Sequence, residues 1–219
     1  MSIKYDTIYD ELYAIELLKG SFLSNVEKFT KSESPDWVSG DGRIGVEVTR
    51  VQFKEEGKLN ALWNKNVGKE RKDIKRNELD ALKRNSFFLE NRLRGYGIIQ
   101  DVPTLKNKAV ETYLRKEEKL NSNFTIFQSN RLFLFISCAF DDKDISEIAR
   151  LILERRKQDN VKFDIIYILN DDQFYVIELR DFDIGMGKLL LKSENMKELK
   201  SIAGARRNEH EWKNGDVYK

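Results

Sequence analysis

The N-terminal part of the chain alternates apolar and polar residues with a helical period. Apolar residues recur there every three or four positions: Ile8, Leu12, Ile15, Leu18, Phe22 and Val26. This spacing predicts an amphipathic helix over residues 6 to 29. Two acidic residues, Glu11 and Glu16, lie on the two shoulders of the apolar stripe, where their carboxylates can reach the edge of a packed face.

The next segment, SPDWVSGDGRIGVEVT at residues 34 to 49, predicts a β-hairpin. Two short strands, 36–38 and 44–49, flank the turn sequence SGDG. Successive side chains of a strand point to opposite faces, so Val46 and Val48 point one way. Glu47 and Thr49 therefore point the other way. Pro35 favours an extended entry into the first strand.

The rest of the pattern alternates helices and strands. Residues 54–94 are predicted to be rich in helix, and a Gly- and Pro-containing break precedes a helix over 105–121. An apolar run at 132–140 predicts a buried central strand. A helix opened by capping aspartates follows, then strands at 163–169 and 173–179. We expect an α/β fold, a mixed sheet covered by helices on both faces.

The domain organisation follows from the same pattern. The length of 219 residues fits one large domain over 1–183 that carries a helical insertion at 54–103. The polar stretch 184–219 is predicted to be a tail with one helix over 193–204.

Charge is unevenly distributed along a chain whose net charge is only +2. Residues 54–94 hold twelve Lys and Arg against seven acids, and residues 140–183 hold seven against twelve. A basic segment of this kind is compatible with nucleic-acid binding, although a solvated helix face gives the same count. The candidate phosphate contacts are Lys65, Lys69, Arg71, Lys72, Lys75 and Arg76.

Cysteine and histidine are nearly absent. Cys138 lies in an apolar run and is predicted to be a core residue, and His210 lies in a polar segment. One cysteine and one histidine exclude an intramolecular disulfide, a thiolate zinc site and mechanisms that need two histidines. No signal-peptide pattern or long apolar run is present, so a soluble cytoplasmic protein without membrane contact is expected.

The chemistry of the hairpin centres on two carboxylates. Asp36 and Glu47 lie on neighbouring strands and can approach within a few ångströms on one face. Two such carboxylates repel unless a cation lies between them, and Mg²⁺ or Mn²⁺ with oxygen ligands suits this arrangement. The Val48 carbonyl is a natural third ligand, and Glu16 or Glu11 of the preceding helix can complete the set.

These residues carry a resemblance to a known family. The segment SPDW, the following VEVT, the preceding helix with acids and the later helix with RKEEKLNSNF resemble the PD-(D/E)xK, or restriction-endonuclease-like, nuclease superfamily. The resemblance covers roughly residues 8–50 and 105–140. It implies a metal-dependent phosphodiesterase core, with Asp36 as the motif aspartate, Glu47 as the second acid and Glu16 as the helix acid.

Thr49 departs from the family pattern, which has a lysine two residues after the second acid. The resemblance implies that this lysine orients the attacking water and neutralises the phosphate. A lysine from elsewhere can take this role, and Lys116 near the apolar face of the predicted helix 105–121 is the candidate. Lys119 points further outward, and Lys54 is also near in sequence.

Two functions remain open from the sequence. The first is a metal-dependent endonuclease or exonuclease that hydrolyses DNA or RNA. The second is a nuclease-fold module without activity that binds nucleic acid or a protein partner. The insertion is in addition a candidate surface for a homodimer.

Overall fold

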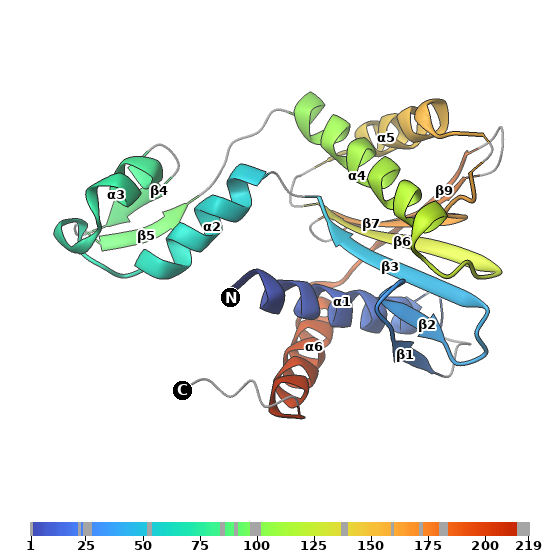
Figure 1. The fold of residues 1–219 in the computed structure, drawn as a ribbon, viewed down its shortest axis with the longest axis horizontal. Coiled ribbons are helices and arrows are strands. Elements are labelled where there is room, and N and C mark those ends of the chain that lie inside the picture. Colours follow the sequence, from blue (N-terminus) through green and yellow to red (C-terminus); the bar gives the residue numbers. More distant parts are fainter. Residues whose placement is uncertain are drawn as a thin grey trace. The chain divides into compact units, whose positions relative to one another are not determined.

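The computed structural model describes residues 2–21, 23, 28–51, 54–83, 86–89, 92–96, 102–136, 140–158, 160–170, 173–179 and 184–213. The chain divides into two compact units (Figure 1). One consists of Met1–Asp6 and Gln52–Leu105, and the other of Thr7–Val51 and Lys106–Lys219. The predicted insertion at 54–103 therefore corresponds closely to a unit of its own.

The larger unit is built on a mixed seven-stranded sheet with the strand order β1-β2-β3-β6-β7-β8-β9. Its strands are β1 (Phe29–Lys31), β2 (Trp37–Ser39), β3 (Ile44–Arg50), β6 (Ser129–Ile136), β7 (Ile165–Asn170), β8 (Gln173–Leu179) and β9 (Ile184–Leu190). The central strands β3, β6 and β7 are parallel, and the outer strands join antiparallel. The predicted mixed α/β class is confirmed.

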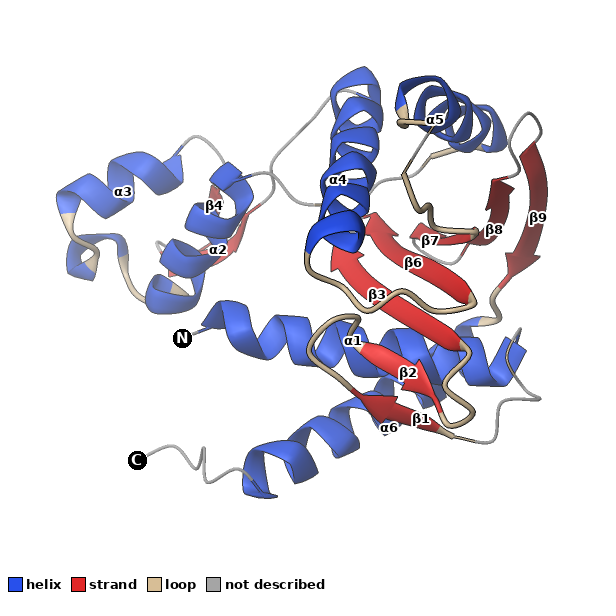
Figure 2. Ribbon diagram, turned by 45° about the vertical axis from the view of Figure 1, so that its right-hand side comes forward, coloured by secondary structure: helices blue, strands red, loops and turns tan. Residues whose placement is uncertain are grey.

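Helices cover both faces of this sheet (Figure 2). One face carries α4 (Val102–Ser122) and α5 (Asp142–Arg155), and the other carries α1 (Ser2–Ser21) and α6 (Ser193–Lys213). Side-chain ion pairs from Lys106 to Asp144 and Glu147 link α4 to α5. The predicted aspartate cap of α5 is confirmed, because Asp141 accepts hydrogen bonds from two backbone amides of its first turn.

The main core lies between the sheet and α1. Its fully buried members include Ile15 and Leu18 of α1, Val46 of β3 and Phe133 of β6. Val46 and Val48 therefore face α1, and the alternation predicted for β3 directs Glu47 to the α4 face. The parallel register sets Glu47 beside Leu132 of β6, and the Glu47 side chain is buried.

Two predicted boundaries at the ends of the larger unit were wrong. The first helix ends at Ser21, and residues 29–31 form the edge strand β1. Part of the predicted stripe, Phe22 and Val26, lies outside the described residues, as does Cys138. Residues 184–190, predicted as tail, form the strand β9. Most of this edge strand is exposed and it holds two glycines, so its sequence lacks the apolar alternation of a half-buried strand.

The smaller unit contains α2 (Lys54–Asn66), a 3₁₀ turn (Arg71–Asp73), α3 (Arg76–Lys83) and a hairpin of β4 (Ser86–Leu89) and β5 (Arg92–Tyr96). Leu59, Ile74 and Leu82 form its core. The segment 54–94 is rich in helix as predicted, but it also holds this hairpin, which was not predicted; the aromatic residues of SFFL favour a strand.

None of the described helices combines the length and the apolar character needed to cross a bilayer. The backbone of His210 belongs to α6, but its side chain lies outside the described part of the structure.

Candidate active site

The hairpin of β2 and β3 fixes the position of Asp36. The Ser39 hydroxyl accepts hydrogen bonds from the backbone amides of Arg43 (3.2 Å) and Ile44 (2.9 Å), and Gly42 adopts a φ of 70° in the turn. β2 begins at Trp37, which pairs with Val46, so Asp36 lies just before the first residue of β2. From there the Asp36 Oδ2 atom accepts a hydrogen bond from the Val48 amide at 2.8 Å.

Close packing holds this end of the hairpin against β3. A Cβ atom built on Gly45 would lie 2.8 Å from Pro35 Cγ and 2.6 Å from Phe127 Cδ2. Both distances are shorter than van der Waals contact, so only glycine lets Pro35 and Phe127 approach the strand here. Gly45 thus allows Pro35, the residue before Asp36, to pack directly on β3.

The carboxylate of Glu11 approaches Asp36 from α1. Lys31 of β1 lies between them: its Nζ atom bonds to Glu11 Oε2 and lies 3.5 Å from Asp36 Oδ1. The Trp37 indole donates to the Glu11 backbone carbonyl at 3.1 Å and so joins this turn of α1 to β2. Burial, and next the charge of Asp36, raise the pKa of Glu11 to about 7.

Glu47 approaches from the other side and is bound to Lys116 of α4. The Lys116 Nζ atom bonds to Glu47 Oε1, and both side chains are almost buried, at 12% and 6% exposure. The pKa of Glu47 is raised by burial and by the charge of Asp36, although Lys116 opposes both effects. The second carboxylate oxygen, Oε2, is buried and has no hydrogen-bond partner among the described residues.

The Val48 carbonyl points toward the same place as Asp36. The backbones of Arg43 and Val51 hydrogen-bond to β6. Successive residues of a strand direct their backbone groups to opposite edges, so the even-numbered residues of β3, Val48 among them, direct theirs to the β2 edge. The Val48 amide donates to Asp36, and its carbonyl faces the same edge, beyond the last residue pair between β2 and β3. The Val48 carbonyl therefore lies on the same edge of β3 as the Asp36 carboxylate, whose charge also acts on Glu47.

These oxygen donors supply part of the ligand set of a hard divalent cation. No three His, Cys, Asp or Glu side chains within the described ranges come together as a complete metal site. Mg²⁺, however, needs only one or two carboxylates because it keeps several of its waters. The buried Glu47 Oε2, the Asp36 carboxylate and the Val48 carbonyl are oxygen ligands of the right kind. Lys31 and Lys116 neutralise part of the acidic charge.

The structure separates the two helix acids that the sequence left as candidates. Glu11 lies beside Asp36, whereas the carboxylate of Glu16, the preferred candidate, bonds to Arg206 of α6 and lies 3.5 Å from Lys19. The two are five residues apart and therefore point in different directions from α1. The structure thus places Glu11 in the cluster in place of Glu16.

Two lysines define the cationic part of the cluster. Lys116, predicted to replace the strand lysine, is brought to Glu47, while Lys119 stays exposed and the side chain of Lys54 lies outside the described part. Thr49 is half-buried on the same face as Glu47. Lys31 was missed, because residues up to 29 were assigned to the first helix. A β-propensity reading of Phe29–Lys31 would have placed Lys31 next to Trp37.

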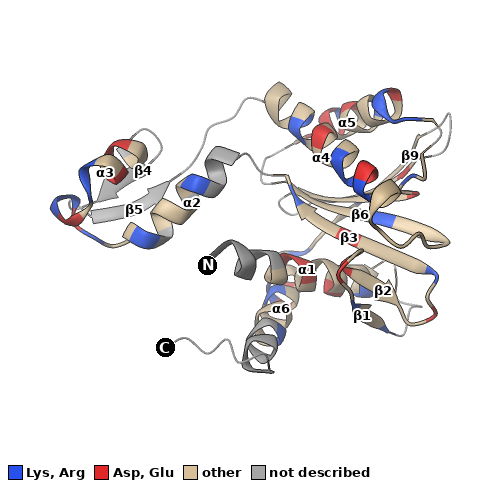
Figure 3. Cartoon of the chain, in the orientation of Figure 1, with Lys and Arg blue, Asp and Glu red and all other residues tan. Residues whose placement is uncertain are grey.

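The predicted phosphate contacts lie in the smaller unit and are all exposed (Figure 3). Three of them have polar partners there: Lys65 bonds to Glu78 at 2.6 Å, Lys72 to Glu70 at 3.0 Å and Lys69 to the Asn66 side chain at 3.2 Å. They form a basic segment on the surface of that unit.

Comparisons of the chain with protein-family models, with curated proteins and with solved structures find no match.

Proposed function

We propose that the protein is a metal-dependent nuclease that hydrolyses phosphodiester bonds in DNA or RNA at the cluster of Glu11, Asp36, Glu47 and Lys116. The observation that carries the proposal is the pairing of Lys116 with Glu47. It puts a buried ammonium on the face that Thr49 shares, where the resemblance to PD-(D/E)xK nucleases calls for a lysine.

The arrangement of elements supports the proposal. The larger unit has α1 before the antiparallel strands β1, β2 and β3, and α4 leads into β6, which pairs parallel to β3. The sequence resemblance implies a core with this order of a helix with acids, a hairpin, a helix and a strand. The acids lie on α1 and at the facing ends of β2 and β3.

Each residue of the cluster has a distinct role in the proposed reaction. Asp36, Glu47 and the Val48 carbonyl would hold Mg²⁺ or Mn²⁺, with Glu11 beside Asp36. A divalent cation there supplies positive charge where negative charge develops on the phosphate. Lys116 adds a fixed positive charge next to Glu47 and can orient a water for attack. Lys31 keeps Glu11 and Asp36 together in the free protein.

The proposal is tested by cleavage of labelled single- and double-stranded DNA and RNA with Mg²⁺ or Mn²⁺. The wild type is compared with Asp36→Ala, Glu47→Ala and Lys116→Ala, and Lys119→Ala serves as a control from the exposed side of α4. Loss of cleavage in the first three variants, with Lys119→Ala unaffected, supports the assignment. Cleavage that survives Asp36→Ala and Glu47→Ala, or no cleavage of any substrate, refutes it.

A second function, a nuclease-fold module that binds without cutting, is favoured by one observation. Lys31 binds Glu11 and Lys116 binds Glu47 Oε1, so these two lysines already neutralise part of the acidic charge of the cluster without a metal. In this case nucleic acid or a protein partner binds, Asp36→Ala leaves the affinity unchanged and no cleavage occurs.

A further inference from the structure

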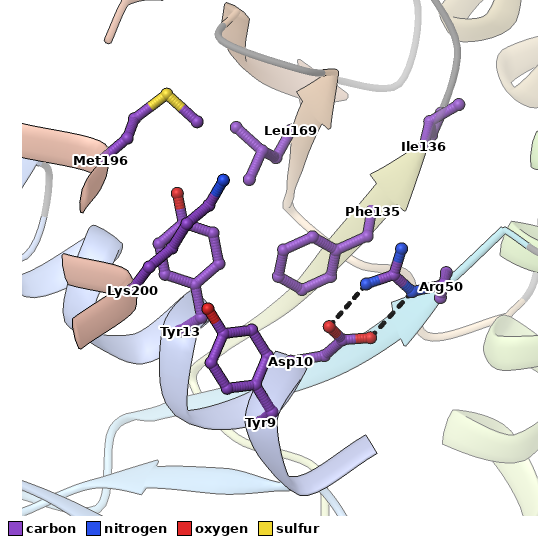
Figure 4. Close-up of a pocket in the computed structure, with 9 residues that line it drawn as sticks. All are labelled: Tyr9, Asp10, Tyr13, Arg50, Phe135, Ile136, Leu169, Met196 and Lys200. Atoms are coloured by element: carbon purple, nitrogen blue, oxygen red, sulfur yellow. Dashed lines mark hydrogen bonds and ion pairs between the residues drawn. The ribbon is translucent and has the colours of Figure 1, made fainter. Parts of the chain in front are cut away.

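A pocket of about 360 Å³ lies between α1, α6 and the ends of the central strands (Figure 4). It is lined by Tyr9, Asp10, Tyr13, Arg50, Phe135, Ile136, Leu169, Met196 and Lys200. All nine residues belong to the larger unit. The volume falls in the range of about 300 to 1,000 Å³ that is typical of small-ligand sites.

Three aromatic rings stack in a row along one side of this pocket. The Tyr9 and Tyr13 rings lie 6.2 Å apart at an angle of 24°, and Tyr13 and Phe135 lie 6.0 Å apart at 26°. Ile136, Leu169 and Met196 supply apolar surface around them. Flat aromatic faces of this kind favour a planar, aromatic ligand.

Two cationic side chains lie over rings of this stack. The Arg50 guanidinium is 5.5 Å from the centre of the Phe135 ring, and the Lys200 ammonium is 5.9 Å from the centre of the Tyr13 ring. Arg50 is fixed by two hydrogen bonds to Asp10, at 2.9 and 2.6 Å. Lys200 is exposed, so its ammonium can bind an anionic group of a ligand.

The Tyr13 hydroxyl is a polar group without a hydrogen-bond partner in the described part of the chain. Tyr13 is only 3% exposed, and its oxygen is buried without a hydrogen-bond partner among the described residues. Buried polar groups are nearly always hydrogen-bonded, because an unpaired one destabilises the fold. A ligand with both donors and acceptors on a flat ring would satisfy this hydroxyl.

The pocket adjoins the candidate active site. Asp10 directly precedes Glu11 on α1, and Arg50 follows Val48 by two residues on β3, a step of about 7 Å along a strand. A polymer bound with a phosphate at the cluster can therefore reach the pocket with a neighbouring unit.

We propose that this pocket takes one unstacked nucleobase of a nucleic-acid strand. The base packs in the pocket beside the stacked rings of Tyr9, Tyr13 and Phe135, it hydrogen-bonds to the Tyr13 hydroxyl, and Lys200 binds the adjoining phosphate. The inference extends the proposed function by naming single-stranded or locally opened nucleic acid as the substrate. Its recognition element is separate from the residues of the cluster.

Binding in the presence of a chelator tests the pocket without cleavage. Fluorescence anisotropy compares a short labelled single-stranded oligonucleotide with a wholly abasic oligomer of the same length and charge. The wild type should bind the intact strand at least fivefold more tightly, since stacking of one base contributes about 1 to 3 kcal/mol. Equal affinity for the two oligomers overturns the proposal.

Three variants assign the contacts. Tyr13→Phe removes only the hydroxyl and should weaken binding of the intact strand about fivefold, as expected for one hydrogen bond, with no effect on the abasic oligomer. Lys200→Gln should weaken both oligomers, and Lys197→Gln, also exposed on α6, should weaken neither. A Tyr13→Phe variant that binds the intact strand like the wild type contradicts the base contact.

Two further outcomes separate this inference from the proposed nuclease function. Base-dependent binding that Tyr13→Phe weakens, without cleavage in Mg²⁺ or Mn²⁺, supports the pocket and refutes the nuclease. Cleavage together with base-independent binding supports the nuclease and refutes the pocket. A free nucleoside monophosphate that binds as tightly as the oligonucleotide shows a mononucleotide site and overturns the strand proposal.

Discussion

Two lysine–glutamate pairs, one in each unit, have the same chemistry and opposite electrostatic outcomes. Lys116 and Glu47 meet in the larger unit with 12% and 6% of their side chains exposed. Lys65 and Glu78 meet in the smaller unit with 54% and 12% of their side chains exposed. The pKa of Glu47 is raised, whereas that of Glu78 is lowered by its hydrogen bonds from Lys65 and Asn66.

The two pairs differ in their access to water and in the charges of their neighbours. Water reaches Lys65, and no nearby carboxylate is among the causes that shift the pKa of Glu78, so the hydrogen bonds dominate. Glu47 is buried on the α4 face of the sheet and also experiences the charge of Asp36. A buried carboxylate with a raised pKa is a typical feature of functional sites, and an exposed ion pair is a typical feature of any surface.

The largest expected effect comes from breaking each pair in turn. Lys116→Ala leaves Glu47 buried without its cation and should lower the free energy of unfolding by about 3 kcal/mol or more. Lys65→Ala removes a largely solvated ammonium and should lower it by about 1 kcal/mol at most. Urea denaturation near neutral pH measures both. Equal losses would show that burial does not distinguish the pairs.

A second variant sharpens the functional side of the comparison. Thr49→Lys in the Lys116→Ala background places an ammonium on the face of β3 that Glu47 occupies. If the lysine serves catalysis, this double variant should recover part of the cleavage lost in Lys116→Ala, as measured with the same labelled substrates. Recovery of stability without recovery of cleavage would assign Lys116 to structure alone.

The next largest effect is the pH dependence of the free energy of unfolding that Glu11 causes. Because its folded pKa is about 7 against 4.5 in the unfolded chain, the folded state binds this proton more tightly. Its contribution to stability is therefore full below pH 4.5, falls between pH 4.5 and 7, and is lost above pH 7. Glu11→Gln should remove this fall and raise the free energy of unfolding above pH 7 by up to about 3 kcal/mol.

Denaturation curves over this pH range, with the exposed Glu118→Gln as the matched control, measure the effect of Glu11. The control should follow the wild type. A Glu11→Gln variant that is less stable than the wild type above pH 7 would show that its bond to Lys31 outweighs burial and the charge of Asp36.

A smaller effect is expected from the packing that holds Asp36 on β3. Gly45→Ala forces Pro35 or Phe127 away from the strand and should lower the free energy of unfolding by about 1 to 3 kcal/mol. Gly187→Ala on the edge strand β9 meets no atom within 4 Å and should be neutral or slightly stabilising. Thermal denaturation of the two variants provides the measurement, and similar melting temperatures would contradict the close packing at Gly45.

The smallest effect is expected from the exposed basic segment. Replacing Lys69, Lys72 and Lys75 by Gln should weaken nucleic-acid binding for all sequences alike. It should also reduce the slope of log affinity against log salt by about two to three, if each lysine contacts a phosphate. Anisotropy titrations at several salt concentrations give the slope. An unchanged slope would leave the basic segment as a solvated surface.

The local pattern of the chain was sufficient for several elements. The hairpin of β2 and β3, the helix α4, the buried strand β6 and the Asp141 cap follow from periodicity and turn residues that act over a few positions. Lys116 was predicted from the face of its helix as the relocated lysine, but its pairing with Glu47, 69 residues away in the chain, depended on how α4 packs on the sheet. The strands β1, β4, β5 and β9 were missed, because short or exposed strands carry little apolar alternation.

The sequence by itself determined the mixed α/β class, the hairpin beside which Asp36 and Glu47 lie and the unusual Thr49, since these depend on local alternation and turn chemistry. Only the tertiary structure decided between Glu11 and Glu16, added Lys31 and formed the pocket at Tyr13. Those features depend on which turn of α1 meets Asp36 and on where α6, almost 190 residues later in the chain, packs against it. Contacts between such distant segments follow from packing of the whole unit, which no local pattern encodes.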